Sequence, residues 1–308
     1  MLTLAFLMAC SSTEPIGTTP GTTAPPPTTT APPPTTARTH PGCAADGHEP
    51  PHLVEMLASH ETWISVLDDD RITDERLLVT GASVPDGLWW QSVVHIWWVN
   101  ASDHTVHHGT VDNLSGELID LGPIVVDGEV FSGMVDPDAV LIDADTVGLT
   151  VLDGFMRRGD PGPICHLRST DGQEFTTHST LLDVTDRFDP SVAIVDGEWW
   201  LALGVLGESP STEVHVGTPE DGFTMVVEVD GAVPDLSYEE GDFRLLTCNL
   251  GELSRYESID GREWKYTGSI RSTGCDPSTI VGTAGLFLFK REPPGSGTEQ
   301  PPQDPPLD

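Results

Sequence analysis

A short proline motif recurs five times and constrains the fold more than any other feature of the chain. In each copy a proline with an aspartate beside it leads into a short apolar strand. The copies are Val84-Pro85-Asp86, Asp136-Pro137-Asp138, Asp189-Pro190-Ser191, Val233-Pro234-Asp235 and Asp276-Pro277-Ser278. Successive prolines lie 52, 53, 44 and 43 residues apart. A repeat of this length is typical of propeller blades and other stacked units.

The unit that begins at Asp189 shows what one repeat contains. Residues 191–195 form a predicted apolar strand, Asp196-Gly197 a turn, and residues 198–204 the returning strand. Residues 213–217 and 223–229 add two strands around a second turn at Asp221-Gly222. Asp-Gly favours tight hairpins because both residues accept a positive φ. The repeat is therefore predicted to be a four-stranded antiparallel blade.

The two ends of the repeat region predict how the ring closes. The fifth unit stops near Arg291, before its outer strands, and residues 53–67 contain a strand that belongs to no repeat. An N-terminal strand that completes the last blade closes the ring and removes its open edges. We predict an all-β fold, a five-bladed β-propeller over residues 49–292 closed by an N-terminal strand. The alternative is a six-bladed ring, in which residues 53–80 form more of a blade.

The N-terminus predicts export and lipidation. Residues 7–10, Leu-Met-Ala-Cys, resemble a bacterial lipobox, which makes Cys10 the lipidated residue and residues 1–9 the signal peptide. Residues 10–48 are rich in Thr and Pro and predict an extended, disordered tether. Residues 293–308 predict a disordered tail. We therefore expect a lipid-anchored, extracytoplasmic protein of the bacterial cell envelope; the alternative is a short apolar N-terminus with an incidental cysteine.

Cysteine content and charge agree with that location. Besides Cys10 the chain has Cys43, Cys165, Cys248 and Cys275, an even number that predicts one or two disulfides without a defined pairing. Acids outnumber lysine and arginine by 49 to 14. Such a negative field repels nucleic acid and anionic lipid surfaces. We predict no nucleic-acid partner and a membrane contact through the N-terminal lipid alone.

Two hairpins resemble a turn of sialidase-like propellers. The segments Ser169–Phe175 and Ser258–Trp264 are similar to the Asp-box turn, in a compact form with glycine directly after the aspartate. In such a turn the carboxylate and the hydroxyl cap backbone amides. The resemblance implies a structural turn at the outer edge of a blade.

The opening of the third repeat, residues 189–201, looks like the blade opening of five-bladed glycosidases of the arabinofuranosidase, xylosidase and fructosidase kind. The resemblance implies acids at the starts of the inner strands: a base in blade one, an acidity-tuning aspartate in blade two and a glutamate as acid in blade three. Carried over by position, it implies Asp86 as the base and Asp136, or alternatively Asp138, as the tuning acid. Blade three departs from the pattern because it opens with Asp189, so the general acid stays unassigned.

The acids beside the prolines have two explanations. Proline starts a strand without needing a ladder donor and aspartate caps the loop, so the motifs require no reaction. Alternatively, five strands that begin around one axis crowd their carboxylates into a ligand-binding funnel. The predicted funnel comprises Asp138, Asp189, Asp235 and Asp276. The histidines 104, 107 and 108 of blade one are predicted to form a solvated edge, and we predict no metal ion and no cofactor.

Two functions remain open at this point. The first is carbohydrate binding or hydrolysis, and an enzyme of this kind would be an inverting glycoside hydrolase. The second is a non-catalytic scaffold that binds another envelope protein. A carboxylate pair beside an aromatic shelf in a deep central pocket favours a glycan partner, and a shallow apolar-rimmed face favours a protein partner.

Overall fold

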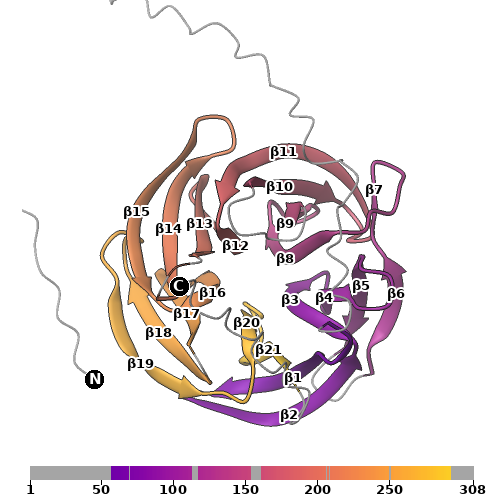
Figure 1. The fold of residues 1–308 in the computed structure, drawn as a ribbon, viewed down its shortest axis with the longest axis horizontal. Coiled ribbons are helices and arrows are strands. Elements are labelled where there is room, and N and C mark those ends of the chain that lie inside the picture. Colours follow the sequence, from indigo (N-terminus) through magenta and orange to yellow (C-terminus); the bar gives the residue numbers. More distant parts are fainter. Residues whose placement is uncertain are drawn as a thin grey trace, which may run out of the picture. The chain divides into compact units, whose positions relative to one another are not determined.

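The computed structural model describes residues 57–68, 70–112, 117–153, 161–205, 207, 209–249 and 251–292. In these residues five antiparallel sheets stand in a ring around one axis (Figure 1). The predicted signal peptide, tether and C-terminal tail lie outside the described residues. Within the described part, no helix is long and apolar enough to cross a membrane.

Each sheet is one blade, and its innermost strand begins at one of the five proline motifs. Blade 1 contains β3 (Ala82–Trp90), β4 (Val93–Asn100), β5 (Val106–Val111) and β6 (Ile119–Pro123). Blade 2 contains β8 (Met134–Leu141), β9 (Val147–Asp153), β10 (Pro161–Ser169) and β11 (Glu174–Thr185), and the short β7 (Val125–Val126) pairs in parallel with β11. Blade 3 contains β12 (Arg187–Val195), β13 (Glu198–Val205), β14 (Ser211–Thr218) and β15 (Gly222–Asp230). Blade 4 contains β16 (Ala232–Glu239), β17 (Asp242–Asn249), β18 (Glu252–Ser258) and β19 (Lys265–Arg271).

Blade 5 joins the two ends of the propeller. It contains β20 (Cys275–Thr279) and β21 (Leu286–Arg291), followed outward by β1 (Glu61–Asp68) and β2 (Arg71–Thr80). Strand β1 pairs antiparallel with β21, so that Trp63 lies opposite Phe289. The predicted five-bladed ring and its N-terminal closure are confirmed. The closing segment reaches Thr80 rather than ending at residue 67, because β2 continues the sheet that β1 begins.

The blades hold together because their middle strands are apolar on both faces. Trp97 and Trp98 are neighbours on β4 and point to opposite faces, as successive strand residues must. Both side chains are fully buried, and they belong to two different apolar cores. Trp97 packs in the core with Leu149 of blade 2, whereas Trp98 packs in the core with Leu288 of blade 5. A sheet packed on both faces explains the consecutive apolar residues of these strands.

A disulfide between Cys248 and Cys275 ties blade 4 to blade 5. It links β17 to β20 across a sequence separation of 27 residues. Cys165, at the centre of blade 2, is also disulfide-bonded. The structure thus provides the Cys248–Cys275 pairing that cysteine counting left open.

The two hairpins similar to the Asp-box share one hydrogen-bond pattern. Asp171 Oδ1 accepts from the backbone N–H groups of Gln173 and Glu174 at 2.9 and 2.8 Å. Asp260 Oδ1 accepts from the corresponding amides, those of residues 262 and 263, at 2.9 and 3.0 Å. Both carboxylates therefore cap their own hairpin, and the relation to the Asp-box itself stays a prediction.

Candidate functional site

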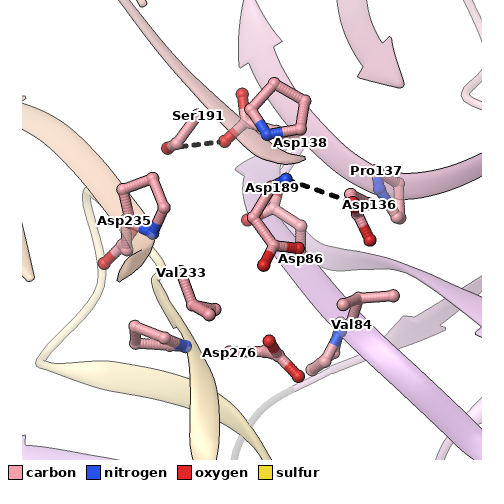
Figure 2. Close-up of a pocket in the computed structure, with 14 residues that line it drawn as sticks. Val84, Asp86, Asp136, Pro137, Asp138, Asp189, Ser191, Val233, Asp235 and Asp276 are labelled. Carbon is pink, nitrogen blue, oxygen red and sulfur yellow. Dashed lines mark hydrogen bonds between the residues drawn. The ribbon is translucent and has the colours of Figure 1, made fainter. Parts of the chain in front are cut away.

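The five proline motifs bring two rings of side chains to the propeller axis (Figure 2). The residues before the prolines form the pre-proline ring, which consists of Val84, Asp136, Asp189, Val233 and Asp276. The residues after the prolines form the post-proline ring, which consists of Asp86, Asp138, Ser191, Asp235 and Ser278. Every acid that the sequence analysis selected lies in one of these rings.

Each motif interrupts its strand in the same way. The register of every inner strand shifts across the motif, for example between Ser83 and Asp86. All five pre-proline residues have a positive φ, between 44° and 56°. This conformation is rare for a β-branched residue, yet Val84 and Val233 both adopt it. The surrounding ring therefore imposes the bend and aims both residues that flank the proline at the axis.

Each side chain of the post-proline ring accepts a hydrogen bond from the next blade. The donor is always the backbone N–H directly after the next ring member. Asp86 Oδ2 accepts from Ala139 at 2.7 Å, and Ser278 Oγ closes the cycle by accepting from Gly87 at 3.0 Å. The three remaining links are Val192 to Asp138 at 2.8 Å, Leu236 to Ser191 at 2.9 Å and Thr279 to Asp235 at 3.0 Å.

Hydroxyl groups also donate to the carboxylates of the same ring. Ser278 donates to Asp86 Oδ1 at 2.7 Å, and Ser191 donates to Asp138 Oδ1 at 2.8 Å. The Thr279 hydroxyl donates to Asp235 at 2.6 Å. Asp86 and Asp138 thus use both carboxyl oxygens to hold neighbouring blades together.

The post-proline ring is buried, and this changes the charge of its acids. Burial raises the pKa of Asp86 to about 7 and that of Asp235 to about 6. Burial, and next the nearby Asp86 carboxylate, raise the pKa of Asp138 well above its ordinary value. Like charges this close cannot all ionise, so the ring keeps a proton at neutral pH.

Asp136 and Asp189 form a hydrogen-bonded pair in the pre-proline ring. The Asp189 backbone N–H donates to Asp136 Oδ2 at 3.1 Å, which brings the two carboxyl groups close together. Burial raises the pKa of Asp136 to about 6, while burial and the Asp136 carboxylate raise the pKa of Asp189 well above its ordinary value. The two carboxyls therefore share a proton at neutral pH.

A lysine supplies the positive charge of the pre-proline ring. Lys290 of β21 lies with its Nζ 2.7 Å from Asp276 Oδ2, and these side chains are only 17% and 7% exposed. Burial lowers the pKa of Lys290, but the carboxylates of Asp276 and Asp189 outweigh burial and raise it. Nearby His60 is neutral, because burial and the Lys290 charge lower its pKa to about 4.

The space inside the two rings is small. Their side chains enclose a cavity of about 30 Å³, which no aromatic residue lines. That is room for about one water molecule. Along the axis, past the post-proline ring, a second cavity of about 210 Å³ includes Trp89 and Tyr238 in its lining.

The structure gathers the predicted acids but separates the two tentative catalytic residues. Asp86 belongs to the post-proline ring and Asp136 to the pre-proline ring. The blade 1 residue equivalent to Asp136 is Val84, and the blade 2 residue equivalent to Asp86 is Asp138. The roles that the resemblance implies for Asp86 and Asp136 stay predictions.

Some axial residues escaped the sequence analysis although signals for them existed. Ser191 and Ser278 occupy the post-proline position of their repeats, which aligning the repeats would have revealed. Lys290 is one of only two lysines of the chain and follows the apolar run 286–289. Lys290 reaches Asp276 because β20 pairs with β21. In this pairing Lys290 lies opposite Cys275, the residue before Asp276.

The predicted solvated edge is wrong for His107 and His108, which are buried, and the histidines of blade 1 do not act as one group. His107 contacts Asp103 and Asp120, whereas His108 Nε2 lies 2.9 Å from His95 Nδ1. His108 Nδ1 contacts the side chain of Gln173 at 3.1 Å. Among the described residues, no three histidine, cysteine or acidic side chains are arranged to hold a metal ion.

No protein-family model and no curated protein sequence matches this chain. Solved structures do match. A thermostable family-43 glycoside hydrolase superposes with a TM-score of 0.56 at 13% identity, covering 68% of this chain and 83% of its own. A family 117 glycoside hydrolase from Zobellia galactanivorans superposes with a TM-score of 0.54 at 10% identity. The superposition covers 78% of this chain and 77% of the hydrolase. A Bombyx mori GH32 β-fructofuranosidase gives a TM-score of 0.51 at 14% identity. The superposition covers 74% of this chain and 56% of the fructofuranosidase. The chain therefore has the five-bladed β-propeller fold of these glycoside hydrolases.

Proposed function

We propose that this protein is a lipid-anchored envelope protein whose glycosidase-like propeller binds carbohydrate without hydrolysing it. The observation that carries this proposal is the closed post-proline ring, in which hydrogen bonds between blades occupy the axial carboxylates. Glycoside hydrolysis needs two carboxyl groups about 5–5.5 Å or 6.5–9.5 Å apart, with the sugar between them. Asp136 Oδ2 instead accepts a hydrogen bond from the Asp189 backbone N–H at 3.1 Å, which leaves no sugar-sized gap there. The cavity of about 30 Å³ has no room for a sugar ring.

A combined binding and turnover screen tests this function. The full-length protein in detergent is applied to a glycan array and to chromogenic arabinofuranosides, xylosides and fructosides. We expect binding to at least one oligosaccharide and no turnover. Turnover that Asp86→Asn and Asp136→Asn both abolish would contradict the proposal and establish a hydrolase. Silence in both assays would favour the protein-binding scaffold.

The proposed anchor is tested at Cys10. We expect Cys10→Ala to move the protein from the membrane fraction to the soluble fraction, because the lipid is the membrane contact that the chain predicts. Fractionation followed by immunoblotting measures the shift, with Thr13→Ala as the control in the same segment. A Cys10→Ala protein that stays with the membranes would refute the anchor.

A further inference from the structure

The largest cavity described here lies away from the acidic rings, between blades 4 and 5. Its volume is about 640 Å³. Binding pockets for small ligands typically measure about 300–1,000 Å³. Elsewhere in the ring neighbouring blades fill the space between them with apolar side chains, so this cleft needs an explanation.

The cleft arises because one face of blade 4 changes from apolar to charged along its length. Residues on β17 and β18 that face blade 5 alternate with residues that face blade 3. The cross-strand pairs on the blade 5 side are Cys248 with Leu253, Leu246 with Arg255, and Arg244 with Glu257. The apolar members pack with Phe287 and Phe289 of blade 5. The charged members line the cavity.

Comparing the five blades at one position shows that blade 4 differs from the rest. Ser237 lies two residues after the post-proline ring and opposite Arg244 on the neighbouring strand. The equivalent residues of the other blades are Leu88, Val140, Ala193 and Ile280. Blade 4 therefore has a small hydroxyl where the other blades have an apolar side chain, and an arginine beside it.

The polar groups of the cleft are held in place. Arg244 donates to Glu239 Oε2 at 3.0 Å, and Arg255 Nε donates to the Thr267 hydroxyl at 3.0 Å. Planar guanidinium and carboxylate groups can bond two neighbouring hydroxyls at once. The half-buried apolar side chain of Leu67 completes the wall and can pack against the C–H face of a sugar. This is the chemistry of a polyhydroxylated ligand.

The charge of the cleft argues against an acidic ligand. Its lining has two guanidiniums, Arg244 and Arg255, against the four carboxylates of Asp68, Asp74, Glu239 and Glu257. An acidic ligand would meet net repulsion there. The cleft also shares Ser237 and Thr279 with the axial cavity of about 210 Å³, whose lining includes Trp89 and Tyr238. Aromatic rings in that position can pack against one terminal sugar.

We infer that the cleft between blades 4 and 5 is the carbohydrate site and that it accepts a neutral oligosaccharide. The inference rests on the proposed function and gives that function a location. It places recognition between two blades, next to the axial cavity that Asp86, Asp138 and Asp235 of the post-proline ring help to line.

Two substitutions test the location. Ser237→Ile inserts the residue that blade 5 carries at the equivalent position and is expected to fill the cleft. Arg244→Ala removes one guanidinium without adding bulk. The full-length proteins are probed on an array of neutral oligosaccharides, xylotriose among them, and of oligogalacturonates, and hits are titrated by calorimetry. We expect at least a tenfold loss of affinity in both variants. Lys265→Ala, an exposed charge on β19, is the control and should bind like the wild type.

The outcomes separate failure of the site from failure of the function. Wild-type binding that both variants retain would refute the cleft and leave the proposed function standing. A wild type that binds no carbohydrate on the array would refute both. Oligogalacturonates bound more tightly than neutral glycans would overturn the assignment of a neutral ligand. Thermal melts of each variant exclude loss of folding as the cause.

Discussion

Lys290→Met is expected to lower the free energy of unfolding by about 3–5 kcal/mol, the range for breaking a buried ion pair by removing one partner. The ammonium lies 2.7 Å from Asp276, and both side chains are largely buried. Without it, Asp276 faces the Asp136–Asp189 pair with no opposite charge nearby. Chemical denaturation at neutral pH, followed by tryptophan fluorescence, measures the loss.

The double variant Lys290→Met/Asp276→Val is the control for this experiment. Valine already occupies the pre-proline position in blades 1 and 4, as Val84 and Val233, with the same positive φ. Removing both charges leaves no unpaired ion, so we expect the double variant to recover most of the lost stability. A single variant within about 1 kcal/mol of the wild type would show that the ion pair does not stabilise the axis.

Asp138→Ala is expected to cost about 2–5 kcal/mol, because it leaves two buried donors without an acceptor. These donors are the Val192 backbone N–H and the Ser191 hydroxyl, which now contact separate carboxyl oxygens at 2.8 Å. Asp138→Ser should cost less, because serine accepts the equivalent N–H at the same ring position in blades 3 and 5. Equal losses in the two variants would mean that the post-proline hydrogen bonds contribute little.

The pH dependence of this loss provides a second readout. Burial raises the pKa of Asp138 in the folded protein, so the folded state keeps a proton that the unfolded chain has released. Stability contributed by such a group is present below its unfolded pKa and is lost as the pH rises through its folded pKa. The difference between wild type and Asp138→Ser should therefore shrink as the pH rises above about 4, the ordinary pKa of aspartate, until Asp138 ionises in the folded protein. A difference that grows with pH would refute the protonated state.

The post-proline ring gives the acids at the proline motifs a structural role. At each motif the strand ladder is interrupted, and a backbone N–H of the next blade needs an acceptor. Aspartate or serine after the proline provides one. The same position around the axis of a propeller can thus carry structural carboxylates as well as catalytic ones.

From the sequence alone we predicted five blades, the order of strands within them and an N-terminal strand in blade 5, with a six-bladed ring as the alternative. These predictions follow from the repeat of the proline motif and, within each repeat, from Asp-Gly turns and apolar runs. The chain also showed where acids would gather, because equivalent positions of a repeat reach equivalent places around the axis.

The hydrogen bonds and ion pairs of those acids depend on contacts between distant parts of the chain. Asp86 meets Ser278 across 192 residues of sequence, and Lys290 meets Asp276 because two strands pair in one register. Likewise, the charged residues of β17 and β18 line a cleft only because blade 5 lies opposite them. Hydrogen bonds, shared protons and cavity volumes depend on distances of a few ångströms between blades. Those distances come from packing the whole ring, which no local pattern encodes.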